Sequence, residues 1–500
     1  MPSRLTSRDG ERDGISEARI RAIVQRVVAE LGERRVVERG SEERRAGESL
    51  HAPRSTPLTS DGLFPNVDAA IQAATIAQRQ LMALTLEKRG EIIAAMRQAA
   101  REAAEAISRL ANEETGMGRW QDKLQKNLLV ANKTPGIEDL EPIAWSGDRG
   151  LTLTERAPYG VIGAITPSTN PTATIICNAI GMIAAGNSVV FNAHPAAKRC
   201  SAAIVQVLQR AIVAAGGPPN VIATVPEPTI ESAQELMRHP GVRLLVVTGG
   251  PGVVKVAMNS GKKAICAGPG NPPVVVDETA NLDQAARDIV FGASFDNNVI
   301  CTEEKEIVAV DSIADKLKAA MLRHQAIEIS PWQLKQLERV LFAETPRPGC
   351  AGTINKQWVG RSVSAILRQI GVTVEDSVRL AFVEVSQEHP LFWTEQLLPI
   401  LPLVRVKSAD EAIDLAIAAE QGNYHTAVMH SQHLEHLSRM AKECNCSIFV
   451  KNGPSLAGLG YGGEGYTSFT IASPTGEGVT GPHSFARLRR CTLVDAFRIV

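Results

Sequence analysis

The chain has 500 residues, a formal net charge of −1, and hydrophobic residues at 44% of its positions. This length is too great for one simple core, so two or three domains are expected. The near-zero net charge argues against nucleic acid as the main partner. No apolar run approaches the roughly 18–20 residues that a membrane span needs, and the charged N-terminus lacks the apolar segment of an export signal.

The cysteines are compatible with a reducing cytosol. Eight are scattered along the chain, which does not resemble the framework of a small disulfide-bonded domain. Cys444 and Cys446 are one residue apart, and no cysteine or histidine pair lies at a zinc-like spacing from them. We therefore expect a cytoplasmic protein without a metal site.

Residues 1–32 predict an isolated amphipathic helix, centred on 15–31. Its apolar positions recur with helical spacing, at Ile20, Ile23, Val24, Val27, Val28 and Leu31. Residues 33–61 are polar and charged and predict a disordered linker. An apolar helix face on such a tether favours docking onto another protein. The alternatives are packing on its own domain and, less favoured, binding to a membrane surface.

From residue 62 the chain reads as globular. Ala-rich helices are expected over 66–115, and strands and helices alternate after that. The expected strands are 152–154, 159–165, 188–192, 221–225 and 243–248, and the expected helices are 175–185, 196–215, 230–238 and one after Pro251. This alternation predicts a parallel sheet covered on both faces, with a ligand at the carboxyl ends of its strands. Thr248-Gly249-Gly250 follows one such end, where glycines let backbone amides approach a ligand.

A second unit begins near Gly268 and continues with mixed helices and strands. Residues 487–500 contain strand-like alternation and are expected to pair with a hairpin at 143–156, within the chain or across subunits. Residues 460–465 match G-x-G-x-x-G. No βαβ unit follows them, so a flexible glycine loop near the mouth of the active site is the better interpretation.

Cys301 is the candidate nucleophile. It follows the small polar turn 294–298 and precedes the apolar run 307–310, which predicts a buried strand. A thiolate at this place could attack a substrate while its backbone N–H stabilises an oxyanion. Taken alone, a structural cysteine is the commoner interpretation.

Together these stretches resemble the aldehyde dehydrogenase superfamily over about residues 62–500. The resemblance rests on Ile165–Pro171, Ala184–Val190, Thr248–Gly250, Asn298–Cys301 and Glu395–Pro402, in that order and spacing. It implies an α/β fold with two Rossmann-like domains and a small β oligomerisation extension. The implied division is an NAD(H)-binding domain over 62–142 and 157–267, oligomerisation strands at 143–156 and 481–500, and a catalytic domain with the nucleophile over 268–480.

The resemblance also implies roles for individual residues. Cys301 would attack an aldehyde, hydride would pass to the nicotinamide, and a thioester would remain on Cys301. Asn170 and the Cys301 N–H would hold the oxyanion, and Glu395 would bind the nicotinamide ribose. Alone, Asn170 would be interpreted as a turn residue before proline. The expected cofactor-binding residues are Thr166, Pro167, Ser168, Asn192, His194, Thr248, Gly249, Gly250, Gly268 and Glu395.

Two departures from the hydrolytic members indicate the branch. Cys266 stands where those relatives carry the glutamate that activates water, so water has no evident general base. The thioester should then persist until a thiol such as coenzyme A arrives. Asn192 and Pro195 replace the lysine and glutamate that grip the adenosine ribose, which would suit a site binding NAD and coenzyme A in turn. His194 could add a ring contact or be a plain loop residue.

The chain is therefore similar to the CoA-acylating aldehyde dehydrogenases, and within them to the propionaldehyde and acetaldehyde enzymes of bacterial microcompartments. In that branch the N-terminal helix is an encapsulation peptide that docks on shell or core proteins. The resemblance implies propionaldehyde as the first substrate, NAD as the cofactor, and a homodimer or homotetramer. Acetaldehyde, a non-acylating reaction, and a catalytically inactive scaffold are the alternatives.

Overall fold

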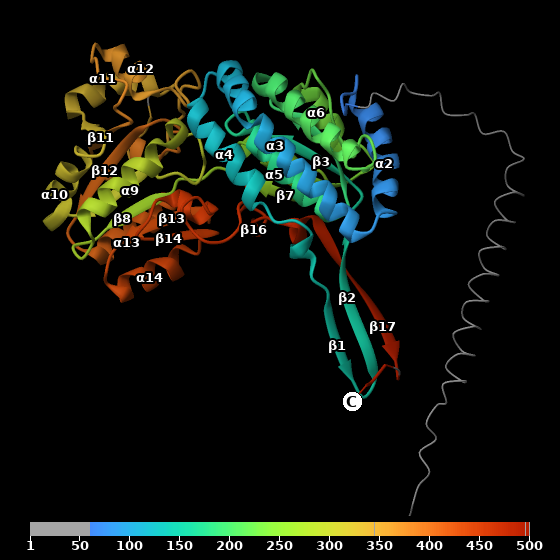
Figure 1. The fold of residues 1–500 in the computed structure, drawn as a ribbon. Helices are drawn as coiled ribbons and strands as arrows, with labels where there is room; N and C mark the ends of the chain where they lie inside the picture. Colours follow the sequence, from blue (N-terminus) through green and yellow to red (C-terminus); the bar gives the residue numbers. More distant parts are fainter. Residues whose placement is uncertain (1–60, 345, 496, 500) are drawn as a thin grey trace, which may run out of the picture. The chain divides into compact units, whose positions relative to one another are not determined.

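The computed structural model describes residues 61–344, 346–495 and 497–499. The helix expected at 15–31 and the linker up to residue 60 lie outside these residues. The described part contains parallel sheets of five and seven strands, each covered by helices, and a separate three-stranded sheet (Figure 1). This arrangement confirms the predicted α/β class. We refer to the regions around the two parallel sheets as the five-stranded half and the seven-stranded half.

The five-stranded sheet has the order β5-β4-β3-β6-β7, with parallel neighbours throughout. Every residue of β3 and β4 is buried, as expected for strands with helices on both faces. From β3 the chain continues to β4 and β5 on one side of the sheet. It then crosses back to add β6 and β7 on the other side of β3, so the strand order reverses between β3 and β6. The strands are β3 (Val161–Thr166), β4 (Ser188–Ala193), β5 (Ile222–Thr224), β6 (Val242–Thr248) and β7 (Lys263–Ala267).

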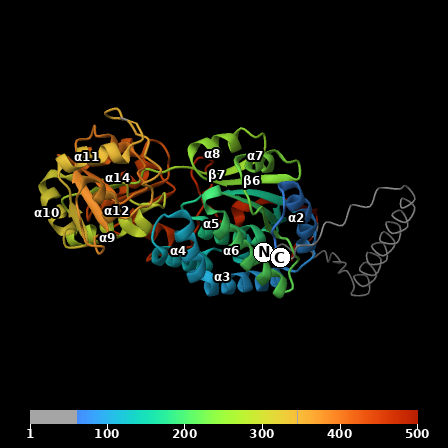
Figure 2. The same ribbon diagram turned by 90° about the horizontal axis from the view of Figure 1, so that it is seen from above.

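Helices form a layer on each face of this sheet (Figure 2). One apolar cluster joins the sheet to α3 (Leu86–Thr115), α5 (Pro171–Ala184) and α6 (Lys198–Ala214). A second cluster, on the other face, joins it to α2 (Val67–Met82), α7 (Ile230–Arg238) and α8 (Pro251–Met258). Helix α4 (Trp120–Lys133) packs beside α3 and α5.

The predicted strands and helices of this half are confirmed, with shifted ends. Helix α5 starts at Pro171 instead of residue 175, because proline is favoured at the first helical position and Asn170 occupies the N-cap. The helix expected at 196–215 is α6, preceded by the short 3₁₀ turn η2 (Pro195–Ala197).

The seven-stranded sheet has the order β10-β11-β12-β9-β8-β13-β14 and is also parallel. The buried strand predicted after Cys301 is β9, at its centre. The strands are β8 (Pro273–Val276), β9 (Glu306–Val310), β10 (Ala326–Glu328), β11 (Leu380–Glu384), β12 (Ile400–Val406), β13 (Thr426–His430) and β14 (Ile448–Lys451). The helices are α9 (Leu282–Ser294), α10 (Asp311–Met321), α11 (Pro331–Leu341), α12 (Val363–Leu367), α13 (Ala409–Glu420) and α14 (Leu434–Cys444).

The third sheet joins the C-terminal segment to the predicted hairpin. Strands β1 (Ile143–Gly147) and β2 (Gly150–Pro158) form the hairpin, and β17 (Ala486–Val494) pairs antiparallel with β2 over its whole length. The predicted pairing of the C-terminal segment with the hairpin is therefore confirmed within the chain for residues 487–494. The three strands extend away from the helices (Figure 1).

The short elements include β15 (Ile471–Ala472) and β16 (Gly478–Val479), which pair antiparallel. The 3₁₀ turns are η1 (Ile137–Leu140), η3 (Phe295–Asn298), η4 (Arg368–Ile370), η5 (Pro390–Trp393), η6 (Ser455–Leu459) and η7 (Pro482–Phe485). The glycine loop 460–465 follows η6, and its carbonyls at Gly460 and Gly463 accept hydrogen bonds from Lys133 Nζ. No βαβ unit contains it, which confirms that its motif is not a dinucleotide fingerprint.

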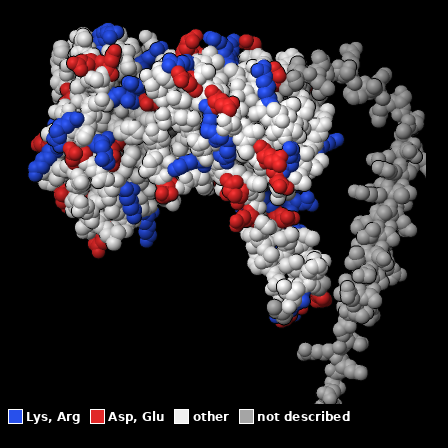
Figure 3. All heavy atoms as spheres, viewed as in Figure 1, with Lys and Arg blue, Asp and Glu red and all other residues white. Residues whose placement is uncertain are grey.

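The surface carries mixed charge. Lysine and arginine alternate with aspartate and glutamate over the face in Figure 3, in agreement with the small net charge. Within the described ranges, no helix combines the length and the apolar character that crossing a membrane requires.

Candidate active site

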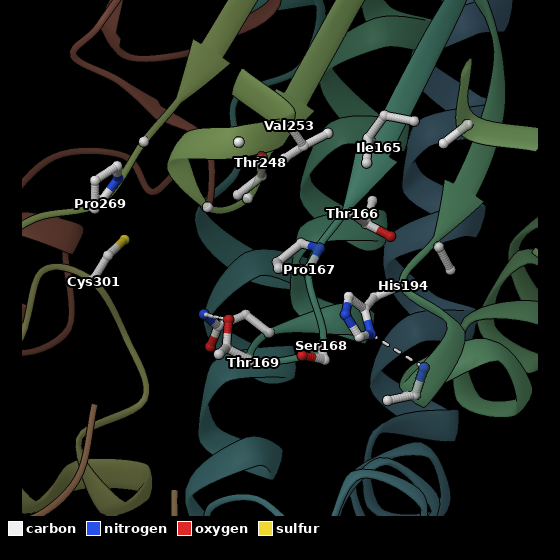
Figure 4. A pocket seen from close by; sticks show the side chains of 18 of the residues that line it. Ile165, Thr166, Pro167, Ser168, Thr169, His194, Thr248, Val253, Pro269 and Cys301 are labelled. Carbon is white, nitrogen blue, oxygen red and sulfur yellow. Dashed lines mark hydrogen bonds between the residues drawn. The ribbon is translucent and has the colours of Figure 1, made fainter. Parts of the chain in front are cut away.

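A cavity of about 890 Å³ lies where the two halves meet. The five-stranded half contributes the segments that follow β3 and β6, the adjacent strands at which the sheet order reverses. Ligands of parallel sheets bind at such points, because the loops leaving the two strands diverge and open a crevice. The seven-stranded half contributes the loop around Cys301 and the segment around Glu395. Figure 4 shows Cys301 and Pro269 facing Thr166 and Pro167 across this space.

All the residues predicted as catalytic or cofactor-binding line this one cavity. They are Thr166, Pro167, Ser168, Asn170, Asn192, His194, Thr248, Gly249, Gly250, Gly268, Cys301 and Glu395. The predicted glycine loop 460–465 is not part of its lining, so the expectation that this loop lies at the mouth is not supported. Tyr461 of the loop packs instead against Phe291 and Phe295.

The loop that carries Cys301 has an unusual backbone. Asp296, Asn297 and Asn298 have φ values of 46°, 57° and 64°. Aspartate and asparagine adopt this left-handed region more readily than other residues with a Cβ. The Asn298 side chain then donates to the carbonyls of Ala293 and Glu304, each at 2.9 Å, which fixes the turn leading to the nucleophile.

Lys305 closes the same loop from inside the protein. Its side chain is fully buried, and Nζ donates to Asn298 Oδ1 at 2.6 Å and to the Ile300 carbonyl at 3.1 Å. Burial raises the pKa values of Glu303, Glu395 and the Cys301 thiol, and the positive charge of Lys305 opposes this rise in all three. Lys305 therefore supports both the shape and the charge balance of the nucleophile loop.

Cys301 is partly exposed and Glu395 is the carboxylate beside it. Burial raises the pKa of the Cys301 thiol to about 12, and the Glu395 carboxylate adds to this shift. Burial likewise raises the pKa of Glu395 to about 7, against the opposite effects of Lys305 and of a hydrogen bond from the Gly270 N–H at 3.2 Å. Among the described residues, no other aspartate or glutamate lines the cavity.

Cys266, which stands where hydrolytic relatives carry the glutamate that activates water, does not reach the cavity. It lies on β7, is fully buried, and belongs to the apolar cluster under α7 and α8. It is not among the residues that line the cavity. Of the cysteines that the structure describes, Cys301 is thus the one that lines this space.

His425 lies close behind the nucleophile and was not identified from the sequence. A Cβ on Gly270 would lie 2.8 Å from His425 Cγ and 2.9 Å from the Cys301 carbonyl, so only glycine fits between them. Burial lowers the pKa of His425 to about 4, and Lys305 contributes in the same direction. The ring is therefore neutral at physiological pH.

Asn170 lines the same cavity as Cys301 and comes from the five-stranded half, at the start of α5. It is 7% exposed and caps α5 without using its side chain for the cap. The side-chain oxygen accepts a hydrogen bond from Lys126 Nζ at 2.6 Å, and Nδ2 donates to Thr169 Oγ1 at 3.2 Å. Lys126 was not identified from the sequence either, and its helix, α4, contributes no residue to the cavity lining.

The far end of the cavity suits a dinucleotide. Its lining includes the apolar Ile230, Ala233 and Val253, and α8 begins directly after Gly250, where a Cβ would meet open space. Free N–H groups at a helix start, with glycine before them, favour phosphate groups. Asn192 accepts a hydrogen bond from Ser232 Oγ at 2.6 Å.

His194 lies at this same end. Its Nδ1 accepts a hydrogen bond from the Ala196 N–H at 3.1 Å (Figure 4). Burial and the charge of Lys356 lower its pKa, so the ring is neutral rather than a phosphate-binding cation. No cluster of histidine, cysteine or acidic side chains suited to a metal ion occurs in the residues described.

Comparisons with known proteins agree with this geometry. Residues 61–329 match the model of the aldehyde dehydrogenase family. The chain is 54% identical over 444 residues to the acetylating acetaldehyde dehydrogenase of Bilophila wadsworthia, covering 88% of this chain and 91% of the relative. The chain belongs to the aldehyde dehydrogenase family.

Two solved structures indicate the branch of the family to which the chain is similar. The propionaldehyde dehydrogenase of Rhodopseudomonas palustris, solved with bound CoA and an acylated cysteine, is 51% identical with a TM-score of 0.86, covering 88% of this chain and all of that one. A propionaldehyde dehydrogenase from the fucose utilisation microcompartment of Clostridium phytofermentans is 46% identical with a TM-score of 0.85, again covering 88% and 100%. The resemblance to CoA-acylating enzymes noted in the sequence is confirmed.

Proposed function

We propose that this protein oxidises a short aldehyde, propanal first, to its acyl-CoA with reduction of NAD. The overall reaction is aldehyde, NAD⁺ and CoA giving acyl-CoA, NADH and a proton. The observation that carries the proposal is the composition of the cavity: among the described residues, its lining contains Cys301 as the one cysteine and the Asn170 amide, and position 266 contributes no carboxylate. The similar enzyme with CoA and an acylated cysteine supports the same chemistry.

The reaction begins with Cys301. Its thiolate attacks the aldehyde carbon and forms a thiohemiacetal, whose oxyanion receives hydrogen bonds from the Cys301 N–H and Asn170 Nδ2. Burial and the charge of Glu395 raise the pKa of the thiol, and the charge of Lys305 opposes this shift and so stabilises the thiolate. When bound, NAD accepts the hydride that leaves the former aldehyde carbon.

The thioester on Cys301 is then the intermediate with which CoA reacts. The thiolate of CoA attacks the acyl carbon, the acyl–Cys301 bond breaks, and Cys301 leaves as a thiolate while acyl-CoA departs. Attack by water would require a general base. Among the described residues, Glu395 is the acidic side chain that lines the cavity, and one of its oxygens accepts the Gly270 N–H. We propose that this carboxylate binds the nicotinamide ribose, as the family resemblance implies.

The types of residue that line the far end of the cavity are suited to binding NAD. Thr166, Pro167, Ser168 and Gly268 form walls beside the nicotinamide end, while Gly249 and Gly250 precede α8. Asn192 and His194 line the end where the adenosine would lie. None of the described residues places a side-chain carboxylate at that end of the lining, which supports alternate occupation by NAD and CoA.

The first experiment measures NADH and acyl-CoA formation from propanal and NAD by the full chain, with and without CoA. Steady NADH formation is expected only with CoA, and about one NADH per active site without it. Steady NADH formation without CoA, with release of free propanoate, would contradict the acylating reaction. Ratios of kcat/KM for propanal and ethanal decide between the two aldehydes.

Variants at two cysteines test the nucleophile. Cys301→Ala is expected to abolish turnover and acyl-enzyme formation, whereas Cys266→Ala should retain both, because Cys266 does not reach the cavity. Acylation of the Cys301→Ala variant by propanal and NAD, seen as added mass on another residue, would place the nucleophile elsewhere.

We also propose that the protein is packaged in a bacterial microcompartment in the cytoplasm through residues 15–31. The helical pattern of that segment supports docking on shell or core proteins, and a similar structure comes from such a compartment. Deleting residues 1–61 should leave activity in solution and abolish co-purification with shell proteins. Loss of activity on deletion, or packaging that persists, would contradict this role.

For the three-stranded sheet we propose a role in forming a homodimer or homotetramer. Its strands expose large apolar side chains, among them Trp145, Leu488 and Val494, at 51%, 62% and 70%, and exposed edges of this kind favour pairing with another copy. Light scattering should give a dimer or tetramer for the natural chain and a smaller species for Leu488→Asp. A monomer in both would rule out the proposed role.

A further inference from the structure

A buried group of charges lies directly behind Asn170. Lys123 and Lys126 of α4 both contact Asp296 of the nucleophile loop, Lys123 at 3.0 Å between Nζ and Oδ2 and Lys126 more closely. The side chains of the two lysines are 3% exposed and that of Asp296 is fully buried. The group joins the five-stranded half to the loop that carries Cys301, and none of its three members lines the cavity.

The two lysines differ in one contact. Lys126 Nζ donates to Asn170 Oδ1 at 2.6 Å. Lys123 Nζ reaches only the Thr169 carbonyl on that side, at 3.4 Å. Both form the ion pair with Asp296, so the contact with the Asn170 amide belongs to Lys126 alone.

This contact decides which way the Asn170 amide faces. An ammonium group carries only donors, so the Asn170 atom that faces Lys126 must be the oxygen. The amide nitrogen therefore lies on the opposite side of the group. One Nδ2 hydrogen is directed to Thr169 Oγ1, and the second is left for a group bound in the cavity.

The charges around the two lysines are balanced by more than one buried acid. A buried carboxylate is balanced by one ammonium, and burying a second charge costs more than a neutral side chain of similar size. Asp296 has further partners, since Oδ1 accepts the Arg119 N–H at 2.6 Å. Glu303 is a second buried acid near Lys126: burial lowers the pKa of Lys126, whereas the charges of Asp296 and Glu303 raise it. The second lysine is therefore not a surplus cation, and the feature that distinguishes it from Lys123 is its contact with Asn170.

We propose that Lys126 is a positioning residue, which holds the Asn170 amide so that Nδ2 faces the oxyanion formed at Cys301. This inference rests on the proposed function, in which Asn170 is an oxyanion donor. Asp296 in turn holds Lys126 and ties its position to the nucleophile loop. Without Lys126 the amide is free to turn, and an oxygen facing the oxyanion would repel it.

The test compares Lys126→Met with Lys123→Met, because both remove one buried ammonium from Asp296 but only the first removes the contact with Asn170. The rate of the first NADH turnover without CoA is expected to fall about 10- to 100-fold in Lys126→Met, which is less than the roughly 100- to 1,000-fold effect of removing an oxyanion donor itself. The KM for NAD should change by less than about threefold. Lys123→Met should keep at least about a third of the rate while unfolding at a lower temperature.

A double variant separates positioning from general damage. Lys126→Met combined with Asn170→Ala should be about as slow as Asn170→Ala alone, because the two residues act through one group. Multiplied effects, or equal losses in the Lys123→Met and Lys126→Met variants, would overturn the proposal. If Asn170→Ala keeps the natural rate, the proposed role of Asn170 fails; if only Lys126→Met keeps it, the inference alone fails.

A spectroscopic readout covers the case in which Lys126→Met does not fold. The carbonyl stretch of [1-¹³C]propanoyl-Cys301 reports hydrogen bonds to the acyl oxygen. In Lys126→Arg the guanidinium has only donors, so the band should stay at the natural frequency. A shift as large as that of Asn170→Ala would overturn the proposal.

Discussion

Replacement of Lys305 by methionine tests how the nucleophile loop is held. Methionine keeps a long unbranched side chain but removes the charge and all donors. Three acceptors then lose their partner: the Asn298 side-chain oxygen at 2.6 Å, the Ile300 carbonyl at 3.1 Å and the Asn298 carbonyl at 3.3 Å. Glu303 and Glu395 also lose the cation that lowers their pKa values.

The magnitude follows from burial. Each buried acceptor left without a donor costs roughly 1–3 kcal/mol, and breaking a buried charge pair costs about 3–5 kcal/mol. These effects overlap, because all of them arise from one ammonium group. We therefore expect the free energy of unfolding to fall by about 3–5 kcal/mol.

Urea unfolding and alkylation of Cys301 measure the two consequences. The matched control is Lys318→Met on α10, where Nζ pairs with Glu328 and Glu384 but the side chain is 16% exposed. The control should lose only about 1 kcal/mol. Iodoacetamide should alkylate Cys301 more slowly in Lys305→Met, because the thiol pKa rises further. Equal urea midpoints in both variants, or faster alkylation, would refute the reasoning.

Three further substitutions give expected outcomes. Glu395→Gln removes a charge that raises the pKa of Cys301, so iodoacetamide should alkylate the thiol roughly two- to tenfold faster. The difference from the natural chain should grow above about pH 7, where Glu395 is ionised. An unchanged alkylation rate at pH 8.5 would contradict the assigned effect. Gly118→Ala places a Cβ on the buried Asp296 carboxylate at φ +72°, and should cost about 2–4 kcal/mol by urea unfolding; a cost below 1 kcal/mol would show that the loop yields. Phe485→Ala, at a side chain 2% exposed, should cost about 3–5 kcal/mol; a thermal midpoint like that of the natural chain would contradict its place in the core.

Much of the fold could be predicted because its pattern is local. Apolar runs such as Ser188–Ala193 are buried on both faces, and the turns between them mark the ends of strands and helices. The exact start of α5 required the position of Asn170 as a cap. The order of strands in the seven-stranded sheet was beyond such patterns, since it depends on which strands pair across long connections.

By itself, the sequence determined that Cys301, Asn170 and Glu395 belong to one site, because each stands in a short motif whose order along the chain is recognisable. Only the tertiary structure decided what surrounds them. Lys126 is 44 positions from Asn170 and 170 from Asp296, and nothing in the periodicity of its helix distinguishes it from Lys123. The physical reason is that a buried charge is selected by the partners that folding brings to it, and those partners come from both halves of the molecule.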